Sequence, residues 1–210
     1  GRIILIDKDV VDITNINRQI HALLTTVGQP KAELMRDRIK LINPECDAVA
    51  LRMFYTEETY EQLLQYPLDY VLDASDTITY KIHLIKECLK RGIPICSSMG
   101  AANKMDPTQF KVADISKTSM DPIARVIRHK LRKDGIKKGV KVVFSTEMPV
   151  KPREDVTQKI VPENAPEIRK AQMPPASNAF CPSVCGLIMA SVAIRDLLKK
   201  HNVVVPTTQR

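Results

Sequence analysis

Residues 3–31 read I-I-L-I-D-K-D-V-V-D-I-T-N-I-N-R-Q-I-H-A-L-L-T-T-V-G-Q-P-K, and this stretch decides the fold. Residues 3–6 are continuously apolar, which is typical of a strand buried on both faces of a parallel sheet. The strand closes at Asp7, and Pro30 suits the first turn of a helix whose apolar residues then follow at helical spacing. The stretch therefore predicts a strand and a helix of an α/β sheet, with an acid at the edge where such sheets bind ligands.

The rest of the first half alternates between strand and helix patterns. Residues 49–53 alternate apolar and polar side chains, and residues 70–72 and 93–96 form short apolar runs. Residues 77–91 have helical spacing and end before Gly92, a common position for a helix C-cap. This order predicts an α/β fold of the Rossmann-like, doubly wound class with a mainly parallel sheet.

The first strand of this chain, at residues 3–6, corresponds to the second strand of this fold class. The first strand and its glycine-rich turn belong in the middle of such a sheet, and no glycine-rich turn is present here. We therefore expect the first βα unit, of at least ~30 residues, to be missing before Gly1.

The second half is less regular. Residues 109–115 and 140–145 are predicted strands, and a basic helix begins at Asp121-Pro122 and runs to about Lys133. Residues 148–182 are rich in proline and charge, which favours a long loop. Residues 183–200 are expected to form a closing amphipathic helix.

Composition excludes several classes of protein. Hydrophobic residues make up 44% of the chain and the mean hydropathy is −0.16, as in ordinary globular proteins. No apolar run approaches the roughly 20 residues that span a bilayer, and the N-terminus lacks a signal-peptide pattern, so we expect no membrane partner and a cytoplasmic location. The cysteines are odd in number, scattered and without a C-x-x-C pair, which argues against a disulfide framework and a structural zinc site and favours reduced, buried thiols. They are Cys46, Cys88, Cys96, Cys181 and Cys185.

Positive charge is concentrated in one segment. The chain carries a formal net charge of +8, and between Lys117 and Lys141 nine Lys and Arg residues face only two acids. A polyanionic partner would explain this concentration, and a solvated helix face would explain it equally well.

Polar side chains follow two of the expected strands. Asp7 closes the first of them, where a carboxylate can accept the hydroxyl hydrogens of a ribose. Arg18 can grip phosphate oxygens with two N–H groups, and Lys31 adds a charge to the positive end of a helix dipole. Asp76 follows another strand and suits a hard cation such as Mg²⁺. Taken one at a time, Asp7 is more often a turn residue, Arg18 a solvated arginine, Lys31 a surface lysine and Asp76 a helix N-cap. The nucleotide hypothesis therefore depends on their order in the chain.

This ordered series resembles the adenylate-forming MoeB/ThiF/HesA family, relatives of the ubiquitin-activating enzymes. Three motifs carry the resemblance over residues 1–115: D-x-D-x-V-x-x-x-N-x-x-R-Q from Asp7, V-G-x-P-K ending at Lys31, and V-L-D-x-x-D ending at Asp76. The resemblance implies one adenylation domain over residues 1–210. Residues 1–115 would form its nucleotide-binding part, residues 116–182 a basic helix and Pro-rich loop insertion, and residues 183–200 a closing helix.

The same resemblance implies ATP and Mg²⁺ as cofactors, with no zinc, and assigns roles to individual residues. Asp7 would bind the ribose, the triphosphate would be contacted by four further side chains, and Asp76 would hold Mg²⁺. The ATP-binding set is Asp7, Asp9, Asn15, Arg18, Gln19 and Lys31. The catalytic set is Arg18, Lys31 and Asp76.

Four further stretches resemble a narrower branch of that family, the tRNA threonylcarbamoyladenosine dehydratases. They are N-R-Q-I-H-A-L at 17–23, M-D-P-T-Q at 105–109, D-I-S-K-T at 114–118 and V-V-F-S-T-E at 142–147. The branch implies ATP-dependent dehydration of N6-threonylcarbamoyladenosine in tRNA, through adenylation of the threonyl carboxylate. The alternative is an adenylating activator of a ubiquitin-like sulfur-carrier protein.

The branch also implies partners. The anticodon stem-loop of tRNA would be bound mainly through its phosphates, because aromatic residues make up only 4% of the chain. The residues expected to contact it are Arg125, Arg128, Arg132 and Lys133. A homodimer and a sulfur-relay protein partner are further expectations from the family.

Overall fold

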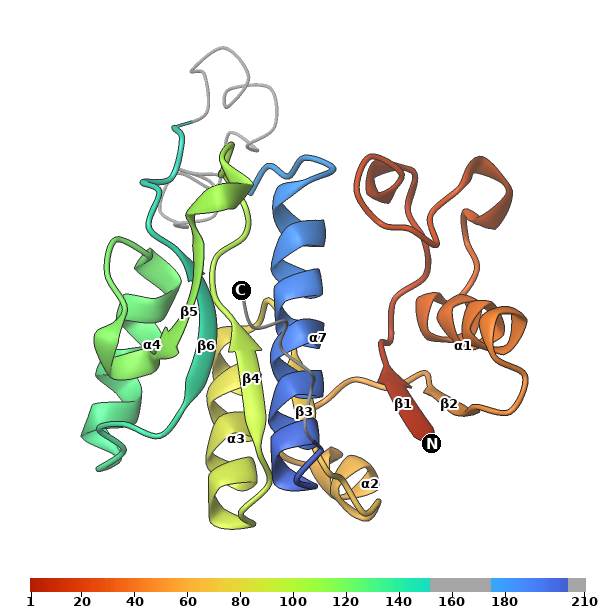
Figure 1. Ribbon diagram of the computed structural model, residues 1–210. Coiled ribbons are helices and arrows are strands. Elements are labelled where there is room, and N and C mark those ends of the chain that lie inside the picture. Colours follow the sequence, from red (N-terminus) through yellow and green to blue (C-terminus); the bar gives the residue numbers. More distant parts are fainter. Residues whose placement is uncertain (152–174, 204–210) are drawn as a thin grey trace, which may run out of the picture. The chain divides into compact units, whose positions relative to one another are not determined.

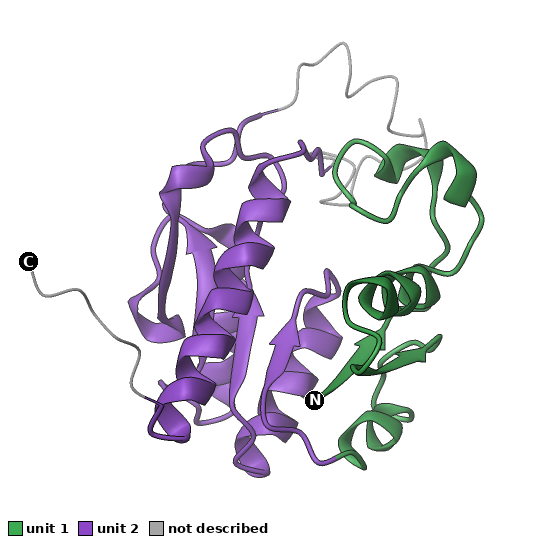
Figure 2. Ribbon diagram, turned by 45° about the vertical axis from the view of Figure 1, so that its right-hand side comes forward, with its two compact units in different colours: residues 1–66 green, residues 67–210 purple. Residues whose placement is uncertain are grey.

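The computed structural model describes residues 1–151 and 175–203 (Figure 1). The chain divides into two compact units, Gly1–Tyr66 and Pro67–Arg210 (Figure 2). Most of the predicted loop at 148–182 lies outside the described residues.

The first unit is built on two parallel strands joined by a helix. β1 (Arg2–Ile6) pairs with β2 (Asp47–Leu51), with Arg2 opposite Asp47 and Ile6 opposite Leu51. The connecting helix α1 (Lys31–Ile42) contacts both strands and begins directly after Pro30, as predicted. Two 3-10 turns, η1 (Ile13–Asn15) and η2 (Leu24–Thr26), lie between β1 and α1, and a short helix α2 (Tyr60–Leu64) follows β2.

The second unit contains a four-stranded sheet in the order β3-β4-β6-β5. Strands β3 (Val71–Asp73), β4 (Ile95–Ser98) and β6 (Lys141–Ser145) are parallel, whereas β5 (Phe110–Asp114) runs antiparallel to β6. Its helices are α3 (Ile78–Lys90), α4 (Pro122–Lys133) and α7 (Cys181–Lys200), and two 3-10 turns, η3 (Pro107–Gln109) and η4 (Ile115–Lys117), flank β5. The predicted mainly parallel α/β fold is confirmed.

Local chemistry explains where two of these helices begin. Asp121 is buried, and its Oδ1 accepts hydrogen bonds from the backbone N–H groups of Ile123 and Ala124 at 2.9 and 3.0 Å, which caps α4. Asn178 Oδ1 accepts a hydrogen bond from Cys181 N at 2.8 Å, so α7 begins two residues earlier than periodicity predicted.

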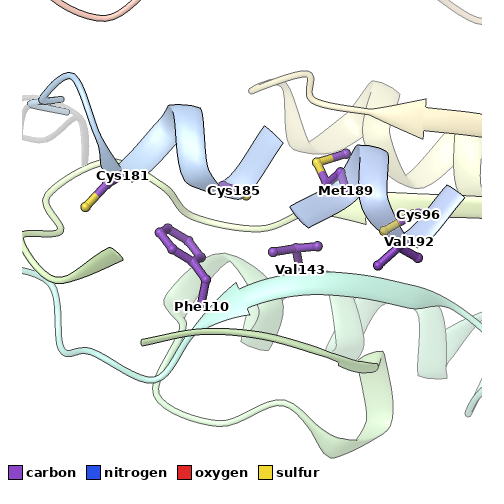
Figure 3. Packing of buried hydrophobic residues seen from close by; sticks show 7 residues of the cluster. All are labelled: Cys96, Phe110, Val143, Cys181, Cys185, Met189 and Val192. Carbon is purple, nitrogen blue, oxygen red and sulfur yellow. The ribbon is translucent and has the colours of Figure 1, made fainter. Parts of the chain in front are cut away.

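The core of the second unit lies between α7 and the sheet. In Figure 1, α7 lies along one face of the sheet and α3 along the other. Figure 3 shows side chains of α7 pointing toward the strands, where burying each large apolar side chain stabilises the fold by about 1.5–3 kcal/mol. The cluster consists of Cys96, Phe110, Val143, Cys181, Cys185, Met189 and Val192.

All five cysteines are free and buried, which confirms the expectation of reduced, buried thiols. Burial raises the pKa of the Cys185 thiol to about 12 and that of Cys96 to about 11. Thiols of this kind are packing residues, because a neutral buried thiol is a poor nucleophile.

Helix α7 corrects one expectation from the sequence. By length and composition alone it is apolar enough to cross a membrane, a test that core helices of globular proteins also pass. The apolar run was missed because Arg195 and Asp196 interrupt it near its end. Asp196 accepts hydrogen bonds from Tyr70 at 2.8 Å and from Lys141 at 2.5 Å, so the charged end of α7 is tied to the sheet.

Candidate nucleotide-binding site

The chain between β1 and α1 folds back on itself. Val11 N donates to Gln29 O at 2.9 Å, and Gly28 N donates to Val11 O at 2.8 Å. Gly28 has a φ of +84°, in the left-handed region that glycine adopts without strain. This pairing brings the start of α1 beside the residues that follow β1.

Asp7, Asp9 and Lys31 therefore lie together. Lys31 N donates to Asp9 O at 3.0 Å, and Lys31 Nζ lies 3.4 Å from Asp9 Oδ2. The Lys31 side chain is 11% exposed and the Asp9 side chain 53%, so the ion pair is half open to solvent and adds little stability. Asp7 Oδ1 accepts a hydrogen bond from Asp9 N at 2.9 Å, which fixes the acid at the end of β1.

Asn15 and Arg18 have local structural contacts. Asn15 is buried, and its Oδ1 accepts a hydrogen bond from Asp12 N at 3.0 Å, while Asp12 Oδ1 accepts one from Thr14 N at 2.8 Å. Arg18 Nη1 donates to Thr14 O at 2.8 Å. Bonds from Thr14 lower the pKa of Asp12, which keeps this cap charged at neutral pH.

Two buried side-chain atoms in the same segment have no hydrogen-bond partner. They are Gln19 Oε1 and His21 Nε2, and within residues 1–151 and 175–203 no other buried side-chain nitrogen or oxygen is left unpaired. An unpaired buried polar atom costs about 1–3 kcal/mol, so each one calls for an explanation. Gln19 was predicted as a site residue, whereas His21 was missed although it lies in the quoted stretch N-R-Q-I-H-A-L.

The second unit places two acids at the carboxyl end of β3, where Asp73 is the last residue of the strand and Asp76 follows it, and they differ in environment. Asp73 is buried and accepts hydrogen bonds from Lys81 Nζ at 2.7 Å and from Ser97 Oγ at 2.6 Å. Asp76 is exposed, and its Oδ1 accepts a hydrogen bond from Thr77 Oγ1 at 3.3 Å. Of the two carboxylates, Asp76 is therefore the one that solvent can reach, and no sequence pattern indicated the buried Lys81 and Ser97.

No His, Cys, Asp or Glu side chains gather in threes as a metal site in the described part of the chain.

The residues after β1 fit a nucleoside triphosphate on their own chemistry. Lys31 puts a positive charge at the N-terminus of α1, where the helix dipole also favours an anion. Gln19 Oε1 is an acceptor without a donor, and a nucleoside offers hydroxyl and amino donors. The arrangement can therefore bind both the anionic and the neutral parts of such a ligand.

The basic helix α4 buries one face and exposes the other. Ala124, Ile127 and Leu131 are buried, whereas Arg125, Arg132 and Lys133 are exposed. Arg128 differs from these three, because its Nη1 donates to Thr118 O at 2.8 Å and also to Thr118 Oγ1. Three of the four residues predicted to bind RNA are thus on the surface, and the fourth holds the segment before the helix.

Comparison with known proteins covers almost the whole chain. The model of the ThiF family matches residues 1–209. The chain is 68% identical over 199 residues to the tRNA threonylcarbamoyladenosine dehydratase of Bacillus subtilis (strain 168), which covers 95% of this chain and 78% of that protein. It is 44% identical over 164 residues to the protein of the same name from Escherichia coli (strain K12), across 75% of this chain and 61% of that one.

A solved structure gives the same result. The crystal structure of the E. coli tRNA N6-threonylcarbamoyladenosine dehydratase, TcdA, in complex with ATP is similar with a TM-score of 0.83 and 35% sequence identity, over 96% of this chain and 77% of that chain. The predicted resemblance is confirmed at the level of sequence and of fold. The chain belongs to the ThiF family, and within it to the branch of the tRNA threonylcarbamoyladenosine dehydratases.

Proposed function

We propose that this chain is an ATP-dependent enzyme that dehydrates N6-threonylcarbamoyladenosine in tRNA by adenylating its threonyl carboxylate. The observation that carries the proposal is the 68% identity to the B. subtilis dehydratase over 95% of this chain. Closure of the modification into a ring is then intramolecular, so it needs no encounter between separate molecules.

The nucleotide would be held by the residues after β1. ATP supplies the adenylyl group that turns a carboxylate oxygen into a leaving group. Lys31, paired with Asp9 at the start of α1, would neutralise phosphate charge, and Arg18 would do the same. Asp7 would accept the ribose hydroxyls, while Asn15 and Gln19 would orient the phosphates with their side-chain amide N–H groups, which leaves Gln19 Oε1 for a donor of the nucleoside. Arg18 and Lys31 are the proposed catalytic residues of this segment.

Asp76 would hold Mg²⁺ and is the third proposed catalytic residue. It is an exposed carboxylate directly after a parallel strand, and Mg²⁺ prefers oxygen ligands of this type. Asp73 is not offered for this role, because its carboxylate is occupied by Lys81 and Ser97.

The anticodon stem-loop would be bound by α4. Arg125, Arg132 and Lys133 supply three exposed positive charges on one short helix, and Arg128 would support them by holding Thr118. Binding of this kind is dominated by phosphate contacts and weakens steeply with salt.

We also propose that residues 1–210 form one adenylation domain and that the protein is a cytoplasmic homodimer. A sulfur-relay protein is a further proposed partner. Support for a dimer comes from exposed apolar side chains between β1 and α1, because such side chains are common at protein interfaces. They are Ile13, Ile20, Leu23, Leu24 and Val27. Sedimentation of the wild-type protein and of a Leu24→Asp variant tests the proposed dimer. If the wild type sediments as a monomer, as the variant does, the dimer proposal is overturned.

Exchange of labelled pyrophosphate into ATP tests the function itself. The protein is assayed with tRNA that carries N6-threonylcarbamoyladenosine, with unmodified tRNA, and with a sulfur-carrier protein that ends in Gly-Gly. Exchange that depends on the modified tRNA supports the proposal. Exchange that depends on the carrier protein overturns it in favour of a carrier activator.

A further inference from the structure

His21 has a buried nitrogen that no other described residue satisfies. Within residues 1–151 and 175–203 its Nε2 has no hydrogen-bond partner, and the same is true of Gln19 Oε1 two residues earlier. The backbone around His21 is fixed, because Ala22 N donates to Gln19 O at 2.9 Å and Thr26 Oγ1 donates to His21 O at 2.8 Å. The unpaired nitrogen is therefore part of an ordered turn.

The charges that act on His21 are the charges of the nucleotide site. Burial, first, and the nearby Lys31 ammonium, second, lower the pKa of His21, and the Asp7 carboxylate partly opposes them. Lys31 stands at the start of α1 and Asp7 at the end of β1, so His21 lies within electrostatic reach of both proposed ATP contacts. A ligand that adds negative charge beside Lys31 must also act on this imidazole.

We propose that His21 is a nucleotide-binding residue, whose Nε2 donates a hydrogen bond to a phosphate oxygen of bound ATP, and that it takes up a proton when the nucleotide binds. This inference rests on the proposed function, and it adds a residue that the family motif at Asp7, Arg18 and Lys31 does not include. The phosphate completes the hydrogen bond that His21 Nε2 leaves unmade, so the cost of that buried nitrogen is removed on binding.

The sign of the pH effect follows from the charges. Without nucleotide, burial and Lys31 keep His21 neutral at neutral pH. Triphosphate oxygens favour the charged imidazolium, so binding raises the pKa of His21. By linkage, ATP then binds more tightly as the pH falls toward the pKa of the bound state. Affinity gains about tenfold for each unit by which binding raises that pKa.

Imidazole titration by NMR provides the direct test. The chain has four histidines, and a His21→Asn variant assigns the resonances of His21. The protein is titrated between pH 5 and 8 with and without saturating Mg-ATP, and nucleotide binding is measured separately by calorimetry. We expect the His21 titration to move to higher pH with ATP.

Calorimetry on variants separates the part of the pH dependence that is due to His21 from the part that is due to protonation of ATP itself. His21→Asn keeps a donor but cannot gain a proton, and His201→Asn is the matched control. The affinity ratio of the wild type to His21→Asn should grow several-fold from pH 8 to pH 6, and the ratio of the wild type to His201→Asn should not change. Saturable binding with an unmoved His21 titration overturns this inference alone. Absence of saturable ATP binding overturns the proposed function and this inference with it.

Discussion

The carboxyl ends of two strands in this molecule each carry a Lys–Asp ion pair, and the two pairs differ in their exposure to solvent. At the end of β3, Asp73 forms an ion pair of 2.7 Å with Lys81, and the side chains of Lys81 and Asp73 are 2% and 1% exposed. After β1, Lys31 and Asp9 are 3.4 Å apart, and Asp9 is half exposed. The first pair is closed to solvent, and the second is open to it.

The difference extends to the neighbouring groups. Around Asp73, Ser97 Oγ donates to Oδ2 at 2.6 Å, and Ser75 N and Oγ donate to Oδ1 at 3.0 and 2.8 Å. In the segment after β1, Gln19 and His21 keep unpaired buried atoms. A saturated network holds structure together, whereas an unsaturated one leaves binding capacity for a ligand. Stability should therefore depend on the first region and nucleotide affinity on the second.

Lys81→Met should have the largest effect. It leaves the Asp73 carboxylate buried without its cation, which typically costs about 3–5 kcal/mol. Urea denaturation measures the loss. Lys86→Met is the matched control, because Lys86 on the same helix pairs with Asp134 at 2.9 Å with both side chains more than 40% exposed. Its loss should stay below about 1 kcal/mol. Equal losses for the two variants would remove the contrast between a closed and an open pair.

Lys31→Met should reverse that pattern. The free energy of unfolding should change by less than about 1 kcal/mol, since the pair with Asp9 is partly exposed. ATP affinity should fall about 10- to 100-fold, because a charge-assisted contact is worth about 1.5–3 kcal/mol. Arg38→Met removes an exposed cation from the same helix and should leave affinity in place. A stability loss as large as that of Lys81→Met would show that both strand ends are structural.

The contrast between the two regions also explains what the sequence could predict. Residues 7–31 are contiguous, so their order and spacing suggested Asp7, Asp9, Gln19 and Lys31 as candidate site residues, and the fold back through Gly28 brings Lys31 beside Asp9. The alternation of apolar runs with helical spacing was sufficient for the α/β class.

The closed region could not be found in this way. Lys81, Asp73 and Ser97 come from α3, β3 and β4, and only the tertiary fold brings them together. The spacing of apolar residues also places a lysine on the exposed face of a helix, whereas Lys81 is buried and its charge is paired with Asp73. His21 was missed for a related reason, since a sequence does not show which imidazole nitrogen is left without a partner.

A third surface, α4, belongs to neither strand end and sharpens the comparison. Replacing Arg125, Arg132 and Lys133 together by Gln should weaken tRNA binding about tenfold or more at moderate salt. The magnitude of the slope of log affinity against log salt concentration should fall by about two to three, because each phosphate contact that is lost no longer releases counterions. ATP affinity should not change. Replacing Arg195, Lys199 and Lys200 by Gln removes the same charge from α7 and is the control. An equal fall in both triple variants would assign the effect to net charge alone.

The smallest expected effect tests the comparison most directly, through two substitutions of opposite sign. Gln19→Leu replaces a buried acceptor that has no donor with an apolar side chain of similar size, so stability should rise by about 1 kcal/mol. Ser97→Ala removes a hydroxyl that donates to Asp73 at 2.6 Å, so stability should fall by about 1–2 kcal/mol. ATP affinity should respond in the other order, falling several-fold in Gln19→Leu and staying constant in Ser97→Ala. Thermal unfolding and calorimetry give both quantities. If Gln19→Leu lost stability, Gln19 Oε1 would have a hydrogen-bond partner within the folded chain. The polar groups after β1 would then be as fully hydrogen-bonded as those at the end of β3.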